Sequence, residues 1–194
     1  MKTALLIGLV LVLTACVTAE QVRPAIHAIN AEFKREYELV LDEIGSRRYP
    51  ISIEEALAAL ARTLDGIGMT IVSQDPMTGL LRARGPAPSP LTDEEWQKAA
   101  EIDQPVMQQI IRPYVGTIPS HFVKLEPEGL DVLIRAIVIP SGIQTEVSLT
   151  ARMREVAPPP SGLPRRDYLP PTAVRMGLEK IWREFERQIE VADR

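Results

Sequence analysis

The chain has 194 residues and a formal net charge of −4. The charge argues against nucleic acid as a partner, because phosphate binding requires a basic excess. One cysteine excludes an internal disulfide and a thiolate metal site. A hydrophobic content of 45% is sufficient for a core, so the composition predicts one ordinary domain and at most two.

The first 16 residues have the order of a secretory signal. A short charged start is followed by an apolar run that ends at Leu13, and small residues then lead to Cys16. The stretch 13–16, Leu-Thr-Ala-Cys, resembles the lipobox of bacterial lipoproteins. This resemblance implies a diacylglycerol on the Cys16 sulfur and cleavage just before it, so that residues 1–15 are a signal peptide. Two or more acyl chains, palmitate among them, would hold the protein stably at a membrane.

Two alternatives to lipidation remain open at this point: an ordinary cleaved signal with an incidental cysteine, or a retained N-terminal anchor helix. Val17 follows Cys16. The absence of aspartate there implies, by resemblance to Gram-negative sorting, delivery to the outer membrane. The expected location is therefore the bacterial cell envelope, on the outer membrane and facing the periplasm.

Residues 16–48 are expected to form the lipidated N-terminus and an amphipathic helix over 24–45. Apolar residues recur at spacings of three and four, and charged residues occupy much of the remaining surface. The narrow stripe consists of Ile26, Ile29, Phe33, Tyr37, Val40 and Ile44. It predicts a helix docked on its own domain or standing as a stalk, with self-association as the alternative.

Residues 49–194 are expected to form a single α+β domain. Ser52 and Glu55 have the spacing of a capping box, which predicts a helix start at Ser52. Residues 69–85 then predict two strands around a turn at 75–79, where proline and glycine favour chain reversal. A second capping box at Thr92 and Glu95 predicts a helical insertion over 92–115, as one or two helices because Pro105 and Pro113 each interrupt helical continuity.

The next segment is rich in strand signals. Turns at 126–129 and 140–142 separate expected strands at 121–125, 130–139 and 143–154. The strand at 143–154 alternates apolar and polar residues, which predicts one solvent-exposed face. The middle strand is apolar on both faces and is expected to be central and covered on both sides. A proline-rich loop over 157–171 precedes a final amphipathic helix from about Thr172.

Together these elements predict an α+β fold, with helices packed on a mostly antiparallel sheet of about four or five strands. The plan over residues 52–85, a glycine-ended helix followed by Asp-Pro-Met-Thr-Gly-Leu-Leu, resembles the α-β-β units of small envelope lipoproteins. The nearest family is the BamC-type helix-grip domain of the β-barrel assembly machinery. The resemblance implies the fold, and the length of the chain and its 92–115 segment depart from that family.

Candidate chemistry is sparse. His27 and His121 have no neighbouring metal-ligand pattern, and the serines lack a nucleophile motif. No metal and no cofactor are expected, and the chain is predicted not to be an enzyme. Arg82 and Arg84 alternate on one strand face, where anionic lipid or acidic glycan is an alternative to plain solvation. Trp96 is expected to be a core aromatic rather than a ligand platform, although its segment is also a candidate contact surface.

The sequence thus predicts a membrane-anchored lipoprotein that acts as a non-enzymatic binding or assembly accessory. Its partners are the membrane, through the lipid on Cys16, and an envelope protein. The candidate partner contacts are Ile26, Phe33, Tyr37 and Trp96. The alternative function is a carrier that holds a small apolar or lipid ligand between helix and sheet, for which a dry cavity of several hundred Å³ would be required.

Overall fold

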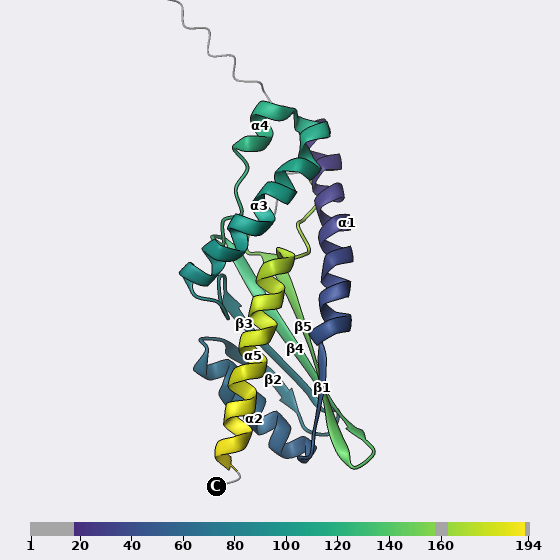
Figure 1. Ribbon diagram of the computed structural model, residues 1–194, viewed down its shortest axis with the longest axis vertical. Helices are drawn as coiled ribbons and strands as arrows, with labels where there is room; N and C mark the ends of the chain where they lie inside the picture. Colours follow the sequence, from purple (N-terminus) through teal and green to yellow (C-terminus); the bar gives the residue numbers. More distant parts are fainter. Residues whose placement is uncertain (1–17, 158–162, 193–194) are drawn as a thin grey trace, which may run out of the picture.

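The computed structural model describes residues 18–157 and 163–192 and has an α+β fold built on one antiparallel sheet (Figure 1). The five strands of the described residues lie in the order β1-β5-β4-β3-β2. They are β1 Ser46–Tyr49, β2 Thr70–Asp75, β3 Leu80–Pro86, β4 Leu130–Ser141 and β5 Gln144–Glu155. The predicted fold class is confirmed. The predicted signal peptide and Cys16 lie outside the described residues.

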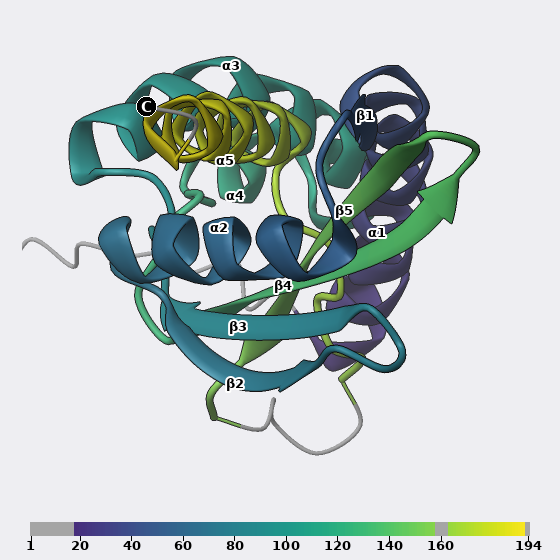
Figure 2. The same cartoon turned by 90° about the horizontal axis from the view of Figure 1, so that it is seen from below.

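Five helices accompany the sheet within the described ranges: α1 Ala19–Ile44, α2 Ile53–Gly66, α3 Asp93–Val115, α4 Thr117–His121 and α5 Pro171–Ala192. Helices α2 and α5 cover one face of the sheet (Figure 2). Helix α3 packs beside α5, and α1 packs against both. The opposite face of β3 and β4 is not covered by any of these helices.

Both predicted capping boxes are confirmed and start α2 and α3. The Ser52 hydroxyl accepts a hydrogen bond from the Glu55 backbone N–H at 3.2 Å, and the Glu55 carboxylate accepts one from the Ser52 N–H at 2.8 Å. Thr92 and Glu95 repeat this arrangement at 3.2 and 2.8 Å. These bonds satisfy backbone donors that the first helical turn leaves without partners. Helix α3 continues through both of its prolines as one helix.

The main core fills the space between the sheet and helices α2 and α5. Alternate residues of each long strand point into it, as the two-residue period of a strand requires. The aromatic rings of Tyr49 and Phe185 meet edge to face with centroids 5.0 Å apart. The Trp182 indole N–H donates to the Ile44 carbonyl at 2.7 Å, which ties the end of α1 to α5.

The apolar stripe of α1 docks on the same chain. Ile29 and Phe33 pack with Met107 and Ile111 of α3 in a second, smaller core cluster. Tyr37 and Val40, further along α1, belong to the main core. The stripe therefore packs within its own domain, and the structure does not have the self-associated alternative.

One predicted strand, residues 121–125, is wrong. The structure has the short helix α4 and then an irregular segment. Its backbone groups bond to side chains of α3 instead of to a strand. The Gln108 amide donates to the carbonyls of His121 and Val123, the Gln104 side-chain oxygen accepts from the Leu125 N–H, and the Trp96 indole donates to the Leu125 carbonyl.

Two further sheet features differ from the expectation. The four-residue edge strand β1 was not predicted, since it has no apolar alternation. Strand β4 is central, as predicted, but it is not covered on both sides. On its second face Leu133 and Ile137 are half-buried, and Arg135 and Ile139 are exposed. The apolar character of that face instead contributes to the site described next.

Candidate binding site on the open face of the sheet

The uncovered face of the sheet carries a cluster of arginines in a groove of about 720 Å³. Helix α1 forms one wall through Tyr37, Glu38 and Leu41, and Val72 of β2 lies on the other side. We call this site the arginine groove. Its five arginines, all exposed, come from β3, β4 and β5: Arg82, Arg84, Arg135, Arg152 and Arg154. They alternate with core residues, so all five project away from α2 and α5.

The strand register arranges these arginines in rows across the sheet. Arg82 of β3 is the direct Cα partner of Arg135 of β4. In the neighbouring row, Leu133 of β4 has Arg84 on one side and Arg152 on the other. Directly opposed side chains lie close enough to interact, so the first row brings two like charges together. The second row places an apolar side chain between two cations.

None of the five arginines forms a salt bridge within the described residues. Three acidic residues are near. Asp131 is the Cα partner of Arg154, Glu38 lines the groove from α1, and the charge of Asp167 acts on Arg152. Positive charge therefore exceeds negative charge here, on a chain whose formal net charge is −4. Such a local excess attracts acidic ligands.

One of the five arginines is held by aromatic rings. The Arg152 guanidinium lies 4.5 Å from the ring centroid of Tyr168 and 5.2 Å from that of Tyr37. The two rings meet edge to face at 5.7 Å. Burial raises the pKa of the Tyr37 hydroxyl, although the Arg152 charge acts in the opposite direction. The cation–π contacts fix Arg152 at the boundary between α1 and the sheet.

The groove has the chemistry of a receptor for carboxylates or phosphates with apolar neighbours. Guanidinium groups present several N–H donors in one plane and pair with such anions in a bidentate manner. The lining also includes the apolar side chains of Leu41, Val72 and Leu133. A ligand that carries both acidic and apolar groups would contact both kinds of lining.

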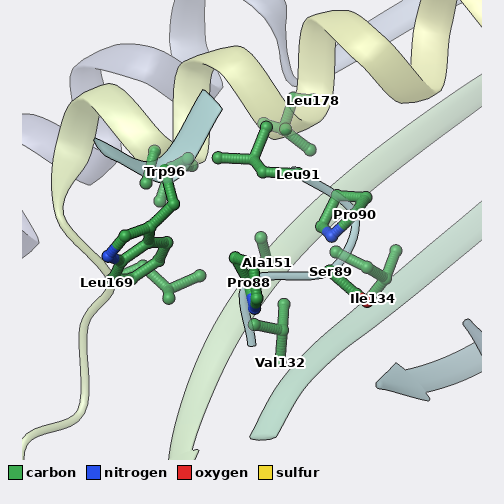
Figure 3. A pocket seen from close by; sticks show the side chains of 13 residues that line it. Pro88, Ser89, Pro90, Leu91, Trp96, Val132, Ile134, Ala151, Leu169 and Leu178 are labelled. Carbon is green, nitrogen blue, oxygen red and sulfur yellow. The ribbon is translucent and has the colours of Figure 1, made fainter. Parts of the chain in front are cut away.

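Within the described residues, the space between helix and sheet is small. A cavity of about 10 Å³ lies between the loop before α3, helix α5 and the sheet. Pro88, Leu91, Trp96 and Leu178 point toward it (Figure 3). This volume has room for about one water molecule. The interface between helix and sheet is therefore filled, which argues against the apolar-carrier alternative.

The predicted contact residues need correction. Phe33, Tyr37 and Trp96 are between 2% and 4% exposed, so their side chains pack mainly in the core, although Tyr37 also lines the arginine groove. Their apolar character reflects intramolecular packing of α1 and α3. Ile26 is half-buried on α1. Cys16, the predicted lipidation site, lies outside the described residues.

Sequence reasoning singled out two of the five groove arginines. The signal for these two was their spacing, because Arg82 and Arg84 lie two residues apart on one face of a single strand. Arg135, Arg152 and Arg154 also occupy alternate, outward positions of their strands. A single sequence does not give the register that brings three strands into line. The two histidines, His27 and His121, are exposed on α1 and α4.

Two other features concern the described residues: a metal centre and a membrane-spanning helix. No group of three or more histidine, cysteine or acidic side chains there is arranged to hold a metal ion. Across residues 18–157 and 163–192, no helix combines the length and the apolar character that crossing a membrane requires.

Comparisons of the chain with protein-family models, with curated proteins and with solved structures found no match. The resemblance to lipoproteins and to the BamC-type domain therefore stays a prediction from the sequence.

Proposed function

We propose that this chain is a lipid-anchored lipoprotein of the bacterial cell envelope that holds an acidic polypeptide segment of a partner in its arginine groove. The anchor would be the acylated Cys16, on the outer membrane and facing the periplasm. The role would be that of a non-enzymatic binding or assembly accessory.

The single observation that carries this proposal is the cluster of arginines without ion pairs on an uncovered sheet face. Like charges directly opposite on neighbouring strands lower stability, so the arrangement is unfavourable for the isolated fold. It becomes favourable when a ligand supplies negative charge. Elsewhere on the described surface, cations commonly have acidic partners, as Arg47 has in Glu186 at 2.7 Å and Arg166 in Glu155 at 2.8 Å.

A polypeptide fits the groove better than a bare polyanion does. Leu41, Val72 and Leu133 line the groove together with the arginines, and a purely charged ligand would leave their apolar surfaces in contact with water. A segment with alternating acidic and apolar side chains would cover both kinds of residue. The lipobox at residues 13–16 supports the envelope as the place where such a partner is met.

A crosslinking pull-down from membranes tests this function. The native protein is compared with the double variant Arg82→Glu, Arg135→Glu and with a control, Arg183→Glu, on the exposed side of α5. We expect a discrete envelope protein to be recovered with the native chain and the control, and to be lost with the double variant. Equal recovery with all three chains would refute the groove as the binding site.

The anchor is tested separately. Mass spectrometry of the mature N-terminus should show an acylated Cys16, and Cys16→Ser should release the chain from membranes. An unmodified chain that begins after Ala19 would refute the lipoprotein assignment.

A further inference from the structure

Three large apolar side chains are exposed within nine residues around α4. Ile118 is 74% exposed, Phe122 is 77% exposed, and Tyr114 at the end of α3 is 37% exposed. We call these three residues the apolar tip. The arginine groove does not include them. Clustered apolar exposure on a folded protein marks a surface that contacts another apolar phase or partner.

The apolar tip lies at the end of the molecule where the described chain begins. Helices α3 and α4 meet beside the first turns of α1, at the top of Figure 1. The packing agrees, since Ala25 of α1 belongs to the same core cluster as Ile111 of α3. The described chain starts at Thr18, two residues after Cys16. A lipid on Cys16 would therefore enter its membrane next to the apolar tip.

The charge around the tip differs from that of the whole chain. Residues 104–125 contain no aspartate or glutamate, although the chain has 26 acidic residues. They contain two cations, Arg112 and Lys124. The adjacent first turns of α1 add Glu20 and Arg23, which offset each other. Anionic headgroups would attract this end of the molecule, whereas the acidic remainder would be repelled.

Hydrogen bonds hold the tip in a fixed shape. The Arg112 guanidinium donates to the Thr117 hydroxyl at 3.2 Å, and the Ser120 hydroxyl donates to the Thr117 carbonyl at 2.8 Å. The Gln108 amide of α3 donates to the carbonyl of His121, the last residue of α4, and to that of Val123 beyond it. The apolar side chains are thus presented on a backbone that is already ordered, which lowers the entropic cost of docking.

We propose that the apolar tip inserts into the lipid surface that carries the protein's own anchor, so that the domain has one fixed orientation on the membrane. This inference rests on the proposed anchor at Cys16. An acyl chain attaches a domain without orienting it, and a second contact next to it does both. Amphipathic side chains such as tyrosine are suited to the headgroup level, and Ile118 and Phe122 to the acyl boundary.

Site-specific fluorescence tests the orientation. Full-length protein carrying Ile118→Cys is purified with its lipid, labelled with an environment-sensitive dye, and placed in vesicles of phosphatidylethanolamine and phosphatidylglycerol. The matched control is Ile143→Cys, because Ile143 is fully exposed in the turn between β4 and β5, at the opposite end of the molecule. An acylated Cys16 does not react with the dye, so each variant carries one label.

We expect the label at position 118 to be shielded from aqueous iodide about threefold better than the label at position 143. Lipids with a quencher in the acyl chain should quench the label at position 118 and leave that at position 143 unchanged. Adding Phe122→Glu to the Ile118→Cys chain should abolish this difference while the protein stays on the vesicles.

The outcomes separate the tip from the anchor. Equal iodide quenching at positions 118 and 143 in an acylated, vesicle-bound protein would refute insertion of the apolar tip. It would leave the lipid anchor at Cys16 in place. If the dye labels Cys16 and vesicles still shield the label at position 118, the lipid anchor at Cys16 is refuted. Insertion of the apolar tip is then retained. Shielding of position 118 in native membranes but not in pure lipid vesicles would refute the lipid contact in favour of a protein.

Discussion

Arg82 and Arg135 are direct partners across β3 and β4, and within the described residues neither has a salt bridge. Two like charges at opposed positions of a sheet repel each other, by an amount that depends on the ions in solution. This pair makes the open face less stable than a neutral face and more attractive to an acidic ligand. Stability and binding are therefore expected to change in opposite directions when the pair is altered.

Replacing one member of the pair should stabilise the unliganded protein. We expect Arg135→Gln to raise the free energy of unfolding by about 0.5 kcal/mol, because one repulsive contact is removed. Urea unfolding at low salt measures this, and the gain should shrink at high salt. Arg183→Gln on α5 is the control and should leave the unfolding midpoint unchanged. A loss of stability in Arg135→Gln would contradict the proposed repulsion.

Asp103 should matter for stability because it holds the start of α5. Its carboxylate accepts hydrogen bonds from the Thr172 backbone N–H at 2.8 Å and from the Thr172 hydroxyl at 2.7 Å, and its side chain is buried. We expect Asp103→Ala to lower the free energy of unfolding by about 1–3 kcal/mol, since the donors of Thr172 lose their acceptor. Thermal unfolding followed by circular dichroism measures the loss.

The same carboxyl group predicts a pH dependence. Burial raises the pKa of Asp103 in the folded protein, although hydrogen bonds from Thr172 act in the opposite direction and Glu36 adds to the rise. The folded state therefore keeps a proton that the unfolded state has lost. The contribution of Asp103 to stability should decrease as the pH rises above about 3.9, the pKa of an unperturbed aspartate, through the folded pKa.

Unfolding of the native chain and of Asp103→Asn across this pH range isolates the effect. The stability of the native chain relative to Asp103→Asn should fall with rising pH within that window and become constant above it. A difference that rises with pH there would show that the folded pKa is lowered instead.

Trp96 joins α3 to the irregular segment after α4. Its indole N–H donates to the Leu125 carbonyl at 3.0 Å in a buried position. Trp96→Phe keeps an aromatic ring but leaves this carbonyl without its donor, so we expect a loss of about 1–3 kcal/mol. Hydrogen exchange should increase most in residues 122–129. Uniform change across the sheet would indicate that the indole acts through general packing alone.

Gly79, in the turn between β2 and β3, lies against β4. A Cβ atom at this position would clash with the Val138 carbonyl oxygen, and the backbone has φ of +65°. Gly142 has the same φ with nothing within 4 Å, so it is a matched control. We expect Gly142→Ala to cost about 1–2 kcal/mol from backbone strain. Gly79→Ala should cost clearly more, and equal losses in urea unfolding would refute the close approach.

Much of the fold could be predicted because its signals are local. The capping residues Ser52 and Thr92 start helices within the next turn, and β5 alternates buried and exposed residues along its own length. Strand β1 could not be predicted, because four residues are too few to show the two-residue period of a strand. The prediction of a strand over 121–125 was wrong because side chains of α3, which are distant in sequence, provide the hydrogen bonds of this segment.

The candidate site was less predictable than the fold. Arg82 and Arg84 could be identified as one strand face, but the remaining arginines join them only through the register of three strands. The reverse error concerns Phe33 and Trp96, whose apolar side chains resembled a contact surface before the docking of α1 and α3 was known. Long-range packing decides both which arginines share the groove and which apolar side chains are buried. Neither the periodicity nor the composition of the sequence gives that packing.

The length of α1 determines how far the groove would stand from the lipid. Eighteen residues separate the first residue of the helix, Ala19, from Tyr37 in the groove wall, which corresponds to about 27 Å of helix at 1.5 Å per residue. In an upright domain that separation is about three times the distance over which physiological salt screens charge. The guanidinium groups would then be electrically independent of the bilayer beneath them and would respond to macromolecules in the aqueous compartment.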